Sequence, residues 1–426
     1  MIEAQKPVRR VGMISLGCPK NLVDAEIMLG QLQAESEVVL TNDLDEADVV
    51  IVNTCGFIDA AKQESIDTIL EVAERKGSGL ERLIVSGCMV QKYRTDLQQS
   101  IPEIDAFVGL DHLEGITAAV TGREEDLAPA KRKMSTRLYE DLPRVLTQGT
   151  AHAYLKVSEG CSNPCTFCAI PQMRGKFRSR TLDSLVREAK ALESAGVLEL
   201  NLVAQDTTRY GQDLGVENGL TQLVRRLLDE TGFQWIRFLY AYPGSIDWSL
   251  FELMGREKRF ASYCDIPLQH VSKNVLERMR RPGSPVEYRE MIQRMRDLVP
   301  DITLRTTFIT GHPGETAKDF GEMHDFVEWA QFDNMGAFVY SAEDSTLAAK
   351  MPDIPTRSTA ERRRAKLMEL QQTIALSRNE TRVGQTYDAI VTGVCEETEH
   401  LLEGRIIGQA AEIDGRLLIN DGIDLL

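Results

Sequence analysis

Residues 159–168 have the sequence Glu-Gly-Cys-Ser-Asn-Pro-Cys-Thr-Phe-Cys, directly after a stretch of alternating apolar residues, 152–158, that is typical of a strand. Its three cysteines, Cys161, Cys165 and Cys168, can all reach one metal centre, and thiolates select iron–sulfur clusters, zinc or copper. A structural zinc or a saturated cluster needs four protein ligands, whereas this loop offers three. The spacing therefore predicts a metal centre with one open corner, where a small molecule can chelate. A zinc loop completed by a distant residue and a disulfide are the alternatives.

The loop resembles that of the radical S-adenosylmethionine superfamily in its cysteine spacing, in the aromatic residue before the last cysteine and in the preceding strand. This resemblance implies that Cys161, Cys165 and Cys168 hold a 4Fe–4S cluster, whose unique iron binds the amine and carboxylate of the cofactor's methionine. It also implies that Phe167 packs beside the cofactor.

The composition is that of an ordinary globular protein, with 27% charged and 42% apolar residues, and 426 residues suffice for about three domains. No run approaches the ~18 apolar residues of a membrane span, and the first residues lack the apolar core of a signal peptide. We therefore expect a cytoplasmic location without membrane contact, where the eight cysteines act as metal ligands rather than disulfides. The formal charge of −16 argues against wide contact with bare phosphate backbone and favours a basic partner.

Residues 1–122 are predicted to form a domain in which strands alternate with helices, as in a doubly wound parallel sheet. The predicted strands are 11–16, 37–40, 49–52, 83–85 and 104–108, with helices from Pro19 and over 58–75. Cys18, Cys55 and Cys88 each follow a strand end, and carboxyl ends of parallel strands share one edge. In the order 2-1-3-4-5 their strands are neighbours about 4.8 Å apart. This predicts a second three-cysteine cluster; chance placement of small buried cysteines is the alternative.

The two three-cysteine sites together resemble the methylthiotransferases, which carry such an amino-terminal domain before the radical domain. The matching segments are Ser-Leu-Gly-Cys-Pro-Lys-Asn at 15–21, Asn-Thr-Cys-Gly at 53–56 and Ser-Gly-Cys at 86–88. The resemblance implies that the chain holds two 4Fe–4S clusters and uses S-adenosylmethionine, and that the second cluster holds the sulfur to be inserted.

Residues 123–150 are polar and lack periodicity, which predicts a linker, and residues 151–345 again alternate between strands and helices. Six such units fit a partial (βα)6 barrel with its site at the carboxyl ends of the strands. The segment Gly311, His312, Pro313, Gly314, Glu315 follows one of these strands and resembles the family's Gly-x-Pro-Gly-Glu, which lines the cofactor site. His312 stands where the family usually has an aromatic residue. Gln205 and Asp206 follow another strand and resemble a cofactor-facing segment.

A cationic run, Arg174, Lys176, Arg178 and Arg180, follows the cysteine loop directly. Such a run is either a solvated face or an anchor for a carboxylate of the cofactor or of an acidic substrate side chain. The sequence Arg-Gly-Lys-Phe-Arg-Ser-Arg resembles the subfamily that modifies a ribosomal protein rather than tRNA. The segment Asp-Ile-Pro-Leu-Gln-His at 265–270 also resembles the subfamily that modifies a ribosomal protein. This resemblance makes Gln269 and His270 candidate substrate-facing residues.

Residues 346–382 are predicted to contain a helix that straps the barrel, and residues 383–426 short strands that resemble a small, incomplete TRAM barrel. The latter region has nine acidic and two basic side chains, a balance that repels RNA and suits a basic protein. Cys264 and Cys395 match no family position and are expected to be buried free thiols.

These resemblances imply methylthiolation of an aspartate β-carbon in small-subunit ribosomal protein S twelve, with a reduced flavodoxin- or ferredoxin-type electron donor and no direct RNA substrate. The alternatives are a tRNA adenosine methylthiotransferase and a non-catalytic iron–sulfur carrier. A carrier does not need the cavity of a barrel-sized central domain.

Overall fold

The computed structural model describes residues 8–123 and 140–421, which form two compact units. The first comprises Met1–Thr147, Glu159–Ser162 and Ala169–Arg178, and the second comprises Gln148–Ser158, Asn163–Cys168 and Ser179–Leu426. The cysteine loop is therefore divided, with Cys161 in the first unit and Cys165 and Cys168 in the second. Most of the predicted linker, residues 124–139, lies outside the described residues. The domain boundaries expected from the sequence stay a prediction.

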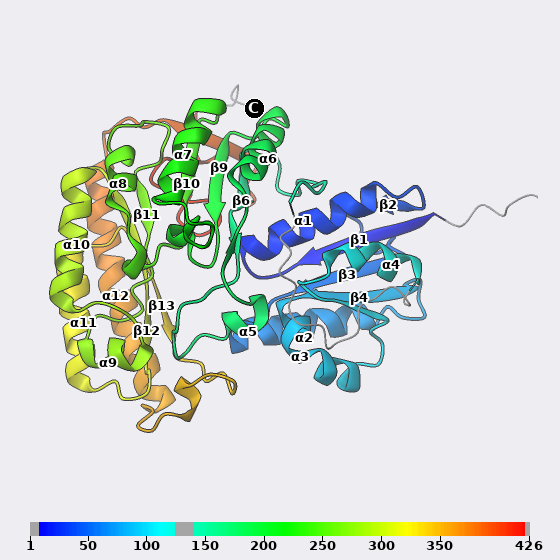
Figure 1. Cartoon of the computed structure of the whole chain (residues 1–426), viewed down its shortest axis with the longest axis horizontal. Coiled ribbons are helices and arrows are strands. Elements are labelled where there is room, and N and C mark those ends of the chain that lie inside the picture. Colours follow the sequence, from blue (N-terminus) through cyan, green and yellow to red (C-terminus); the bar gives the residue numbers. More distant parts are fainter. Residues whose placement is uncertain (1–7, 124–139, 422–426) are drawn as a thin grey trace, which may run out of the picture. The chain divides into compact units, whose positions relative to one another are not determined.

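The first unit is built on a five-stranded parallel sheet of order β2-β1-β3-β4-β5, which confirms the predicted order. The strands are β1 (Arg9–Ser15), β2 (Val38–Leu40), β3 (Val49–Thr54), β4 (Arg82–Gly87) and β5 (Ala106–Val108). The helices are α1 (Pro19–Gln33), α2 (Asp59–Ala73), α3 (Cys88–Ser100) and α4 (Ile116–Thr121). Helices α1 and α4 cover one face, and α2 and α3 cover the other (Figure 1). Every residue of β3 is buried because both faces of this central strand are covered.

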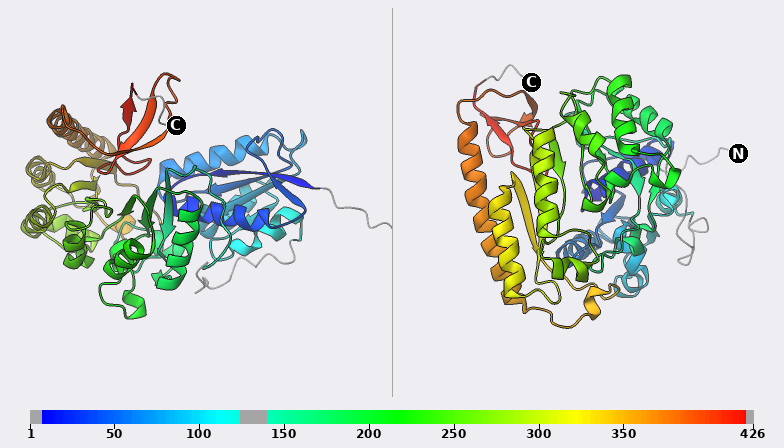
Figure 2. Two further views of the ribbon diagram at one scale, coloured as in Figure 1. Left: turned by 90° about the horizontal axis from the view of Figure 1, so that it is seen from above. Right: turned by 60° about the vertical axis from the view of Figure 1, so that its left-hand side comes forward.

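The second unit contains six parallel strands in two three-stranded sheets, β10-β9-β6 and β11-β12-β13. The strands are β6 (His152–Lys156), β9 (Glu199–Val203), β10 (Trp235–Phe238), β11 (Tyr263–Asp265), β12 (Thr303–Thr310) and β13 (Asn334–Val339). The longer helices that alternate with these strands lie on their outer side (Figure 1 and Figure 2). This α/β arrangement agrees with the predicted partial barrel.

The helices of this unit follow the strands in the expected alternation. They are α6 (Leu182–Ser194), α7 (Gly219–Glu230), α8 (Trp248–Met254), α9 (Lys273–Met279), α10 (Pro285–Leu298) and α11 (Ala317–Ala330). Around the cysteine loop lie the short elements β7 (Ser158–Glu159), α5 (Ile170–Arg174) and β8 (Arg178–Ser179). Helices α3, α4, α5 and α9 were not predicted from the sequence.

The carboxyl-terminal part begins with the predicted strap helix, α12 (Arg357–Arg382), followed by an antiparallel sheet of β14 (Ala389–Val394), β15 (Leu402–Ile406) and β16 (Leu417–Ile419). It is joined to the six-stranded part by a buried ionic network. Glu199 accepts hydrogen bonds from Arg237 and Arg405, each at 2.7 Å. Within residues 8–123 and 140–421, no helix has the length and apolar character that crossing a membrane requires.

Candidate functional site

The three cysteines of the first unit converge at one edge of its sheet, as predicted. Cys18 precedes α1, Cys55 follows β3, and Cys88 is the first residue of α3. A Cβ at Gly17 would lie 3.1 Å from Cys55 Sγ, and one at Gly56 would lie 3.1 Å from the Cα atom of Met89. The positive φ of Gly17, 95°, also favours glycine at this close approach.

Cys18 affects the ionisation of both Cys55 and Cys88, so the three thiols are electrostatically coupled. The pKa of Cys88 is raised to about 12, chiefly by burial; Arg174 opposes the rise, and the neighbouring Cys18 and Cys55 contribute to it. Burial, together with Cys18, also raises the pKa of Cys55. Burial opposes ionisation of Cys18 as well, but Lys20, Arg174 and two backbone amides outweigh it, and the pKa of Cys18 is lowered. Three thiolates here would repel one another, and a bound cationic cluster would relieve that repulsion.

Asn21 connects the loops that carry the three cysteines. Its amide nitrogen donates to the carbonyls of Leu16, at 2.8 Å, and Thr54, at 3.0 Å. Its Oδ1 lies 3.8 Å from Cys88 Sγ and accepts a hydrogen bond of 3.1 Å from Arg174. Asn21 falls inside a segment that the sequence analysis quoted, but its role depends on contacts with two other loops.

Arg174, the last residue of α5, is 2% exposed and lies in the first unit beside these cysteines. Its Nη1 lies 3.0 Å from Glu159 Oε1 and 3.1 Å from Asp24 Oδ2. The apolar side of the same segment, Ala169 and Met173, packs against Cys88 and Leu110. The expected binding of an external carboxylate by Arg174 stays a prediction; the carboxylates it contacts in the structure belong to the chain itself.

The other cations of this run differ in their surroundings. Arg180 is 4% exposed and donates to Glu188 at 2.5 Å and to Ser184 at 2.7 Å. Arg178 is half-buried and donates to the carbonyl of Lys176 at 3.2 Å. Lys176 itself is exposed and remains accessible to a substrate.

In the second unit, the segment with Cys165 and Cys168 is fixed to the end of α9. The Thr166 amide donates to the carbonyl of Met279 at 3.1 Å, and Thr166 Oγ1 donates to the carbonyl of Arg278 at 2.8 Å. Just beyond α9, Arg281 Nη1 lies 3.6 Å from Cys165 Sγ. Arg281 belongs to no sequence motif that predicts a site, and only its contacts in the structure draw attention to it.

Three rings gather where the predicted cofactor segment follows β12. The ring of His312 lies edge-on to Phe167, with centroids 6.3 Å apart, and to Tyr340, with centroids 5.4 Å apart. Burial lowers the pKa of His312 to about 4, so it is neutral at neutral pH. An aromatic role for His312, where the family usually has an aromatic residue, is compatible with these contacts.

The rest of the segment from Gly311 to Glu315 is held by the strap helix. Glu315 is 4% exposed, accepts from the amide of Gly311 at 2.5 Å and pairs with Arg363 of α12 at 2.7 Å. Burial raises the pKa of Glu315, although Arg363 opposes the shift. Gly311 and Pro313 are buried and Gly314 is half-buried. Glu315 therefore shapes this turn through the strap helix.

Gln205 and Asp206 follow β9 as expected. Gln205 is half-buried, and Asp206 is 1% exposed. Asp206 accepts from Asn163 at 2.8 Å and from Thr208 at 2.9 Å. Burial raises its pKa, and the hydrogen bond from Asn163 partly offsets that rise. Asp206 thus links the cysteine loop to the carboxyl end of β9.

Gln269 and His270 follow β11. Gln269 has a φ of 71°, and its amide donates to the carbonyl of Thr307 at 2.8 Å. His270 is fully buried, and its Nδ1 accepts from the amides of Val271 and Ser272, both at 3.0 Å. Burial lowers its pKa to about 3, so the neutral ring carries its proton on Nε2.

Several buried polar atoms at the carboxyl ends of the strands lack a hydrogen-bond partner among the described residues. They are Thr207 Oγ1, His270 Nε2, Arg281 Nε and His312 Nε2. Such atoms are costly unless something satisfies them. A ligand with an amine, a carboxylate and hydroxyl groups, as S-adenosylmethionine has, fits this set. A cavity of about 480 Å³ in the same unit is lined by residues that follow β9 and β10, among them Thr208, Ser245 and Trp248.

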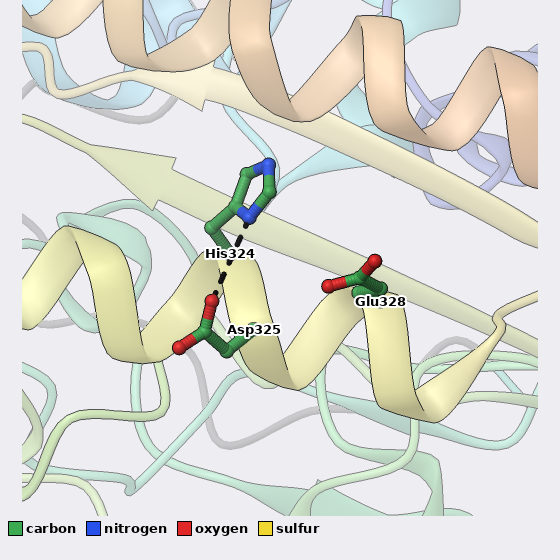
Figure 3. A group of neighbouring side chains, drawn as sticks. All are labelled: His324, Asp325 and Glu328. Atoms are coloured by element: carbon green, nitrogen blue, oxygen red, sulfur yellow. Dashed lines mark ion pairs between the residues drawn. The ribbon is translucent and has the colours of Figure 1, made fainter.

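One group with metal-ligand side chains lies elsewhere, on α11. His324 and Asp325 are paired at 3.9 Å, and Glu328 lies one turn further along the helix (Figure 3). Both carboxylates are exposed. We assign no site to this group, because neighbouring exposed carboxylates are common on protein surfaces.

Two family models match the chain. "Uncharacterized protein family UPF0004" covers residues 10–109, and "Radical SAM superfamily" covers residues 155–327. Curated relatives match almost throughout. The chain is 48% identical to "Ribosomal protein uS12 methylthiotransferase RimO" of Solibacter usitatus, over 97% of the chain and 88% of the relative. Its identity to the protein of the same name from Geobacter sulfurreducens is 45%, over 97% of the chain and 93% of the relative. The chain belongs to the RimO family.

The predicted membership of the radical S-adenosylmethionine methylthiotransferases is thereby confirmed, and the chain is an enzyme of this class. Solved structures share its fold at low sequence identity. The radical S-adenosylmethionine methyltransferase TsrM from Kitasatospora setae has a TM-score of 0.59 at 14% identity, covering 80% of this chain and 77% of that one. The cobalamin-dependent enzyme OxsB has a TM-score of 0.56 at 12% identity, covering 98% and 64%. At this identity the likeness concerns the fold alone, and it supports the predicted α/β class.

Proposed function

We propose that this protein attaches a methylthio group to the β-carbon of an aspartate in ribosomal protein uS12. The observation that carries the proposal is the convergence of Cys18, Cys55 and Cys88, from three separated segments, in a chain that also has the radical-type cysteine loop. Curated relatives that align over 97% of the chain bear the name of a uS12 methylthiotransferase.

In this proposal the chain holds two 4Fe–4S clusters, one on Cys161, Cys165 and Cys168 and an auxiliary one on Cys18, Cys55 and Cys88. When bound, the first cluster with S-adenosylmethionine supplies the radical that removes hydrogen from carbon, and the auxiliary cluster supplies the sulfur. The cysteine loop and the buried polar atoms at the strand ends position the cofactor, with Phe167 beside it. Gln205, Asp206 and the turn from Gly311 to Glu315 form the rest of the cofactor site.

The chain's own groups also exclude water from the reacting atoms. The rings of Phe167, His312 and Tyr340 form an apolar wall. The buried side chains of His270 and His312 are both uncharged at neutral pH. Exposed Lys176 and half-buried Arg178 are the cations of the run that can meet a substrate carboxylate, together with Gln269 near the strand ends. The acidic carboxyl-terminal part favours a basic ribosomal protein over RNA.

The test is to incubate the anaerobically reconstituted enzyme, with S-adenosylmethionine and a reductant, separately with purified uS12 and with tRNA. We expect a mass gain of one methylthio group on a uS12 aspartate and none on tRNA. A mass gain of one methylthio group on tRNA but not on uS12 would refute the substrate assignment. An absence of 5′-deoxyadenosine, despite full iron loading, would favour a non-catalytic carrier. A reduced flavodoxin- or ferredoxin-type protein is the proposed electron donor, and each can replace the chemical reductant in the same assay.

A further inference from the structure

Arg281 contacts three segments that meet at the carboxyl ends of the strands in the second unit. Its Nη1 lies 3.6 Å from Cys165 Sγ in the cysteine loop. Its Nη2 donates to the carbonyl of Pro267, after β11, at 2.6 Å. The guanidinium carbon lies 4.7 Å from the ring centre of Tyr242, after β10. A guanidinium held by a carbonyl, a ring and a sulfur has little freedom to move away.

The part of the loop that carries Cys165 is fixed to the same turn. Thr166 is bonded through its amide and hydroxyl to the carbonyls of Met279 and Arg278, and its own carbonyl accepts from the amide of Ala348 at 2.9 Å. Arg280, between the helix and Arg281, adopts the left-handed conformation that ends α9. The position of Arg281 relative to Cys165 is therefore set by backbone contacts as well as by its own side chain.

The charge of Arg281 has no carboxylate partner among the described residues, whereas several other arginines near the strands are paired. Arg237 pairs with Glu199, Arg305 with Asp265 and Arg363 with Glu315. For Arg281, the described contacts are one sulfur, one carbonyl and aromatic side chains. Its Nε is buried and lacks a protein partner in the described part of the chain. The positive charge therefore acts chiefly on Cys165 and on whatever binds there.

We propose that Arg281 is a positioning residue that favours the reduced form of the cluster on Cys161, Cys165 and Cys168, a step on which the proposed function depends. Uptake of one electron adds negative charge to the cluster and its thiolates. A fixed cation and an N–H···S hydrogen bond stabilise that added charge more than they stabilise the oxidised form. Net charge and hydrogen bonds to sulfur are among the factors that set the potentials of such clusters.

The experiment isolates this cluster in the full-length chain by replacing Cys18, Cys55 and Cys88 with alanine. Iron content and the reduction potential are then measured, the latter by electron paramagnetic resonance at controlled potentials. Arg281→Gln removes the charge but keeps a donor, and we expect a more negative potential. At a fixed ambient potential, the ratio of reduced to oxidised cluster should fall about tenfold, as expected when the donor of a hydrogen bond to a charged group loses its own charge.

The matched control is Arg289→Gln. Arg289 also stacks on an aromatic ring, that of Trp329 at 4.4 Å, but it contacts no cysteine. Its replacement should leave the potential unchanged. An Arg281→Gln protein with full iron and the parental potential would overturn the proposal while leaving the proposed function intact. A parental protein that binds no iron would instead overturn the proposed cluster site.

If Arg281→Gln cannot be loaded with iron, Arg281→Lys decides the matter. The proposal requires that lysine, which keeps the charge, restores iron binding at least in part and gives a cluster that can be reduced. Equal loss of iron in the lysine and glutamine variants would show that only the hydrogen bonds of the planar guanidinium, among them the one to the Pro267 carbonyl, matter for iron binding. That result would refute a role of the charge.

Discussion

Replacing Arg174 by methionine removes a buried guanidinium that lies between the carboxylates of Asp24 and Glu159 in the first unit. Arg174 and Asp24 both have side chains that are 1% exposed, and Glu159 is 14% exposed. Breaking a buried ion pair by removing one partner typically costs about 3–5 kcal/mol, because the other charge stays buried without compensation. The lost hydrogen bond to Asn21 adds to this cost. We therefore expect the first unit to lose about 4 kcal/mol of stability.

The chain itself offers a probe for this unit. All three tryptophans, at 235, 248 and 329, lie in the second unit, so their fluorescence does not report on the first. Cys88 is 6% exposed and reacts with a thiol reagent only when the unit opens. Because 1.4 kcal/mol corresponds to a factor of ten, the labelling of Cys88 in the iron-free protein should accelerate about a thousandfold in Arg174→Met. Mass spectrometry of the labelled peptide measures this rate.

Two further variants separate the ion pair from a general packing defect. Arg10 pairs with Glu46 on the surface of the same unit, and Arg10→Met should change stability by less than about 1 kcal/mol. Adding Asp24→Asn to Arg174→Met should recover part of the loss, because the uncompensated buried charge is then gone. Acceleration of less than tenfold in Arg174→Met, or no recovery in the double variant, would refute the reasoning.

Three other outcomes are expected. Cys55→Ala should lower iron by the equivalent of one 4Fe–4S cluster and abolish methylthiolation while 5′-deoxyadenosine still forms; unchanged iron would contradict the ligand assignment. Glu199→Gln should destabilise the second unit by about 3–5 kcal/mol, because two buried guanidiniums lose their counter-ion, with the fluorescence of neighbouring Trp235 following urea unfolding. The exposed Glu230→Gln is its control. His270 is neutral in the folded protein, with a pKa of about 3, whereas an unfolded histidine titrates near 6.5. The unfolded chain therefore binds the extra proton between these values, so the stability that His270 contributes is complete above about pH 6.5 and falls as the pH is lowered toward 3. A urea midpoint in His270→Asn with the same pH dependence as the parent would contradict this assignment.

The sequence by itself determined the sheet of the first unit and the meeting of its cysteines. Alternating apolar strands and helices permit few topologies, and in a parallel sheet all carboxyl ends share one edge. Cys18, Cys55 and Cys88 follow strand ends, so their convergence could be predicted without coordinates. The strands and longer helices of the second unit were predictable for the same reason. Helices α4, α5 and α9 were missed because six, five and seven residues are too few to show a helical period, and α3 is interrupted at Tyr93, whose backbone is not helical.

Only the tertiary structure decided what the arginines do. Arg174 and Arg180 belong to one cationic run, and such a run has the same appearance in a sequence whether it is solvated, binds a ligand or is paired internally. The partner of Arg174 that lies in α1, Asp24, is 150 positions away in the chain, and Cys165 is 116 positions from Arg281. Ion pairs and N–H···S contacts depend on which segments meet to within an ångström. Local periodicity carries no information about such distances, whereas burial and packing fix them.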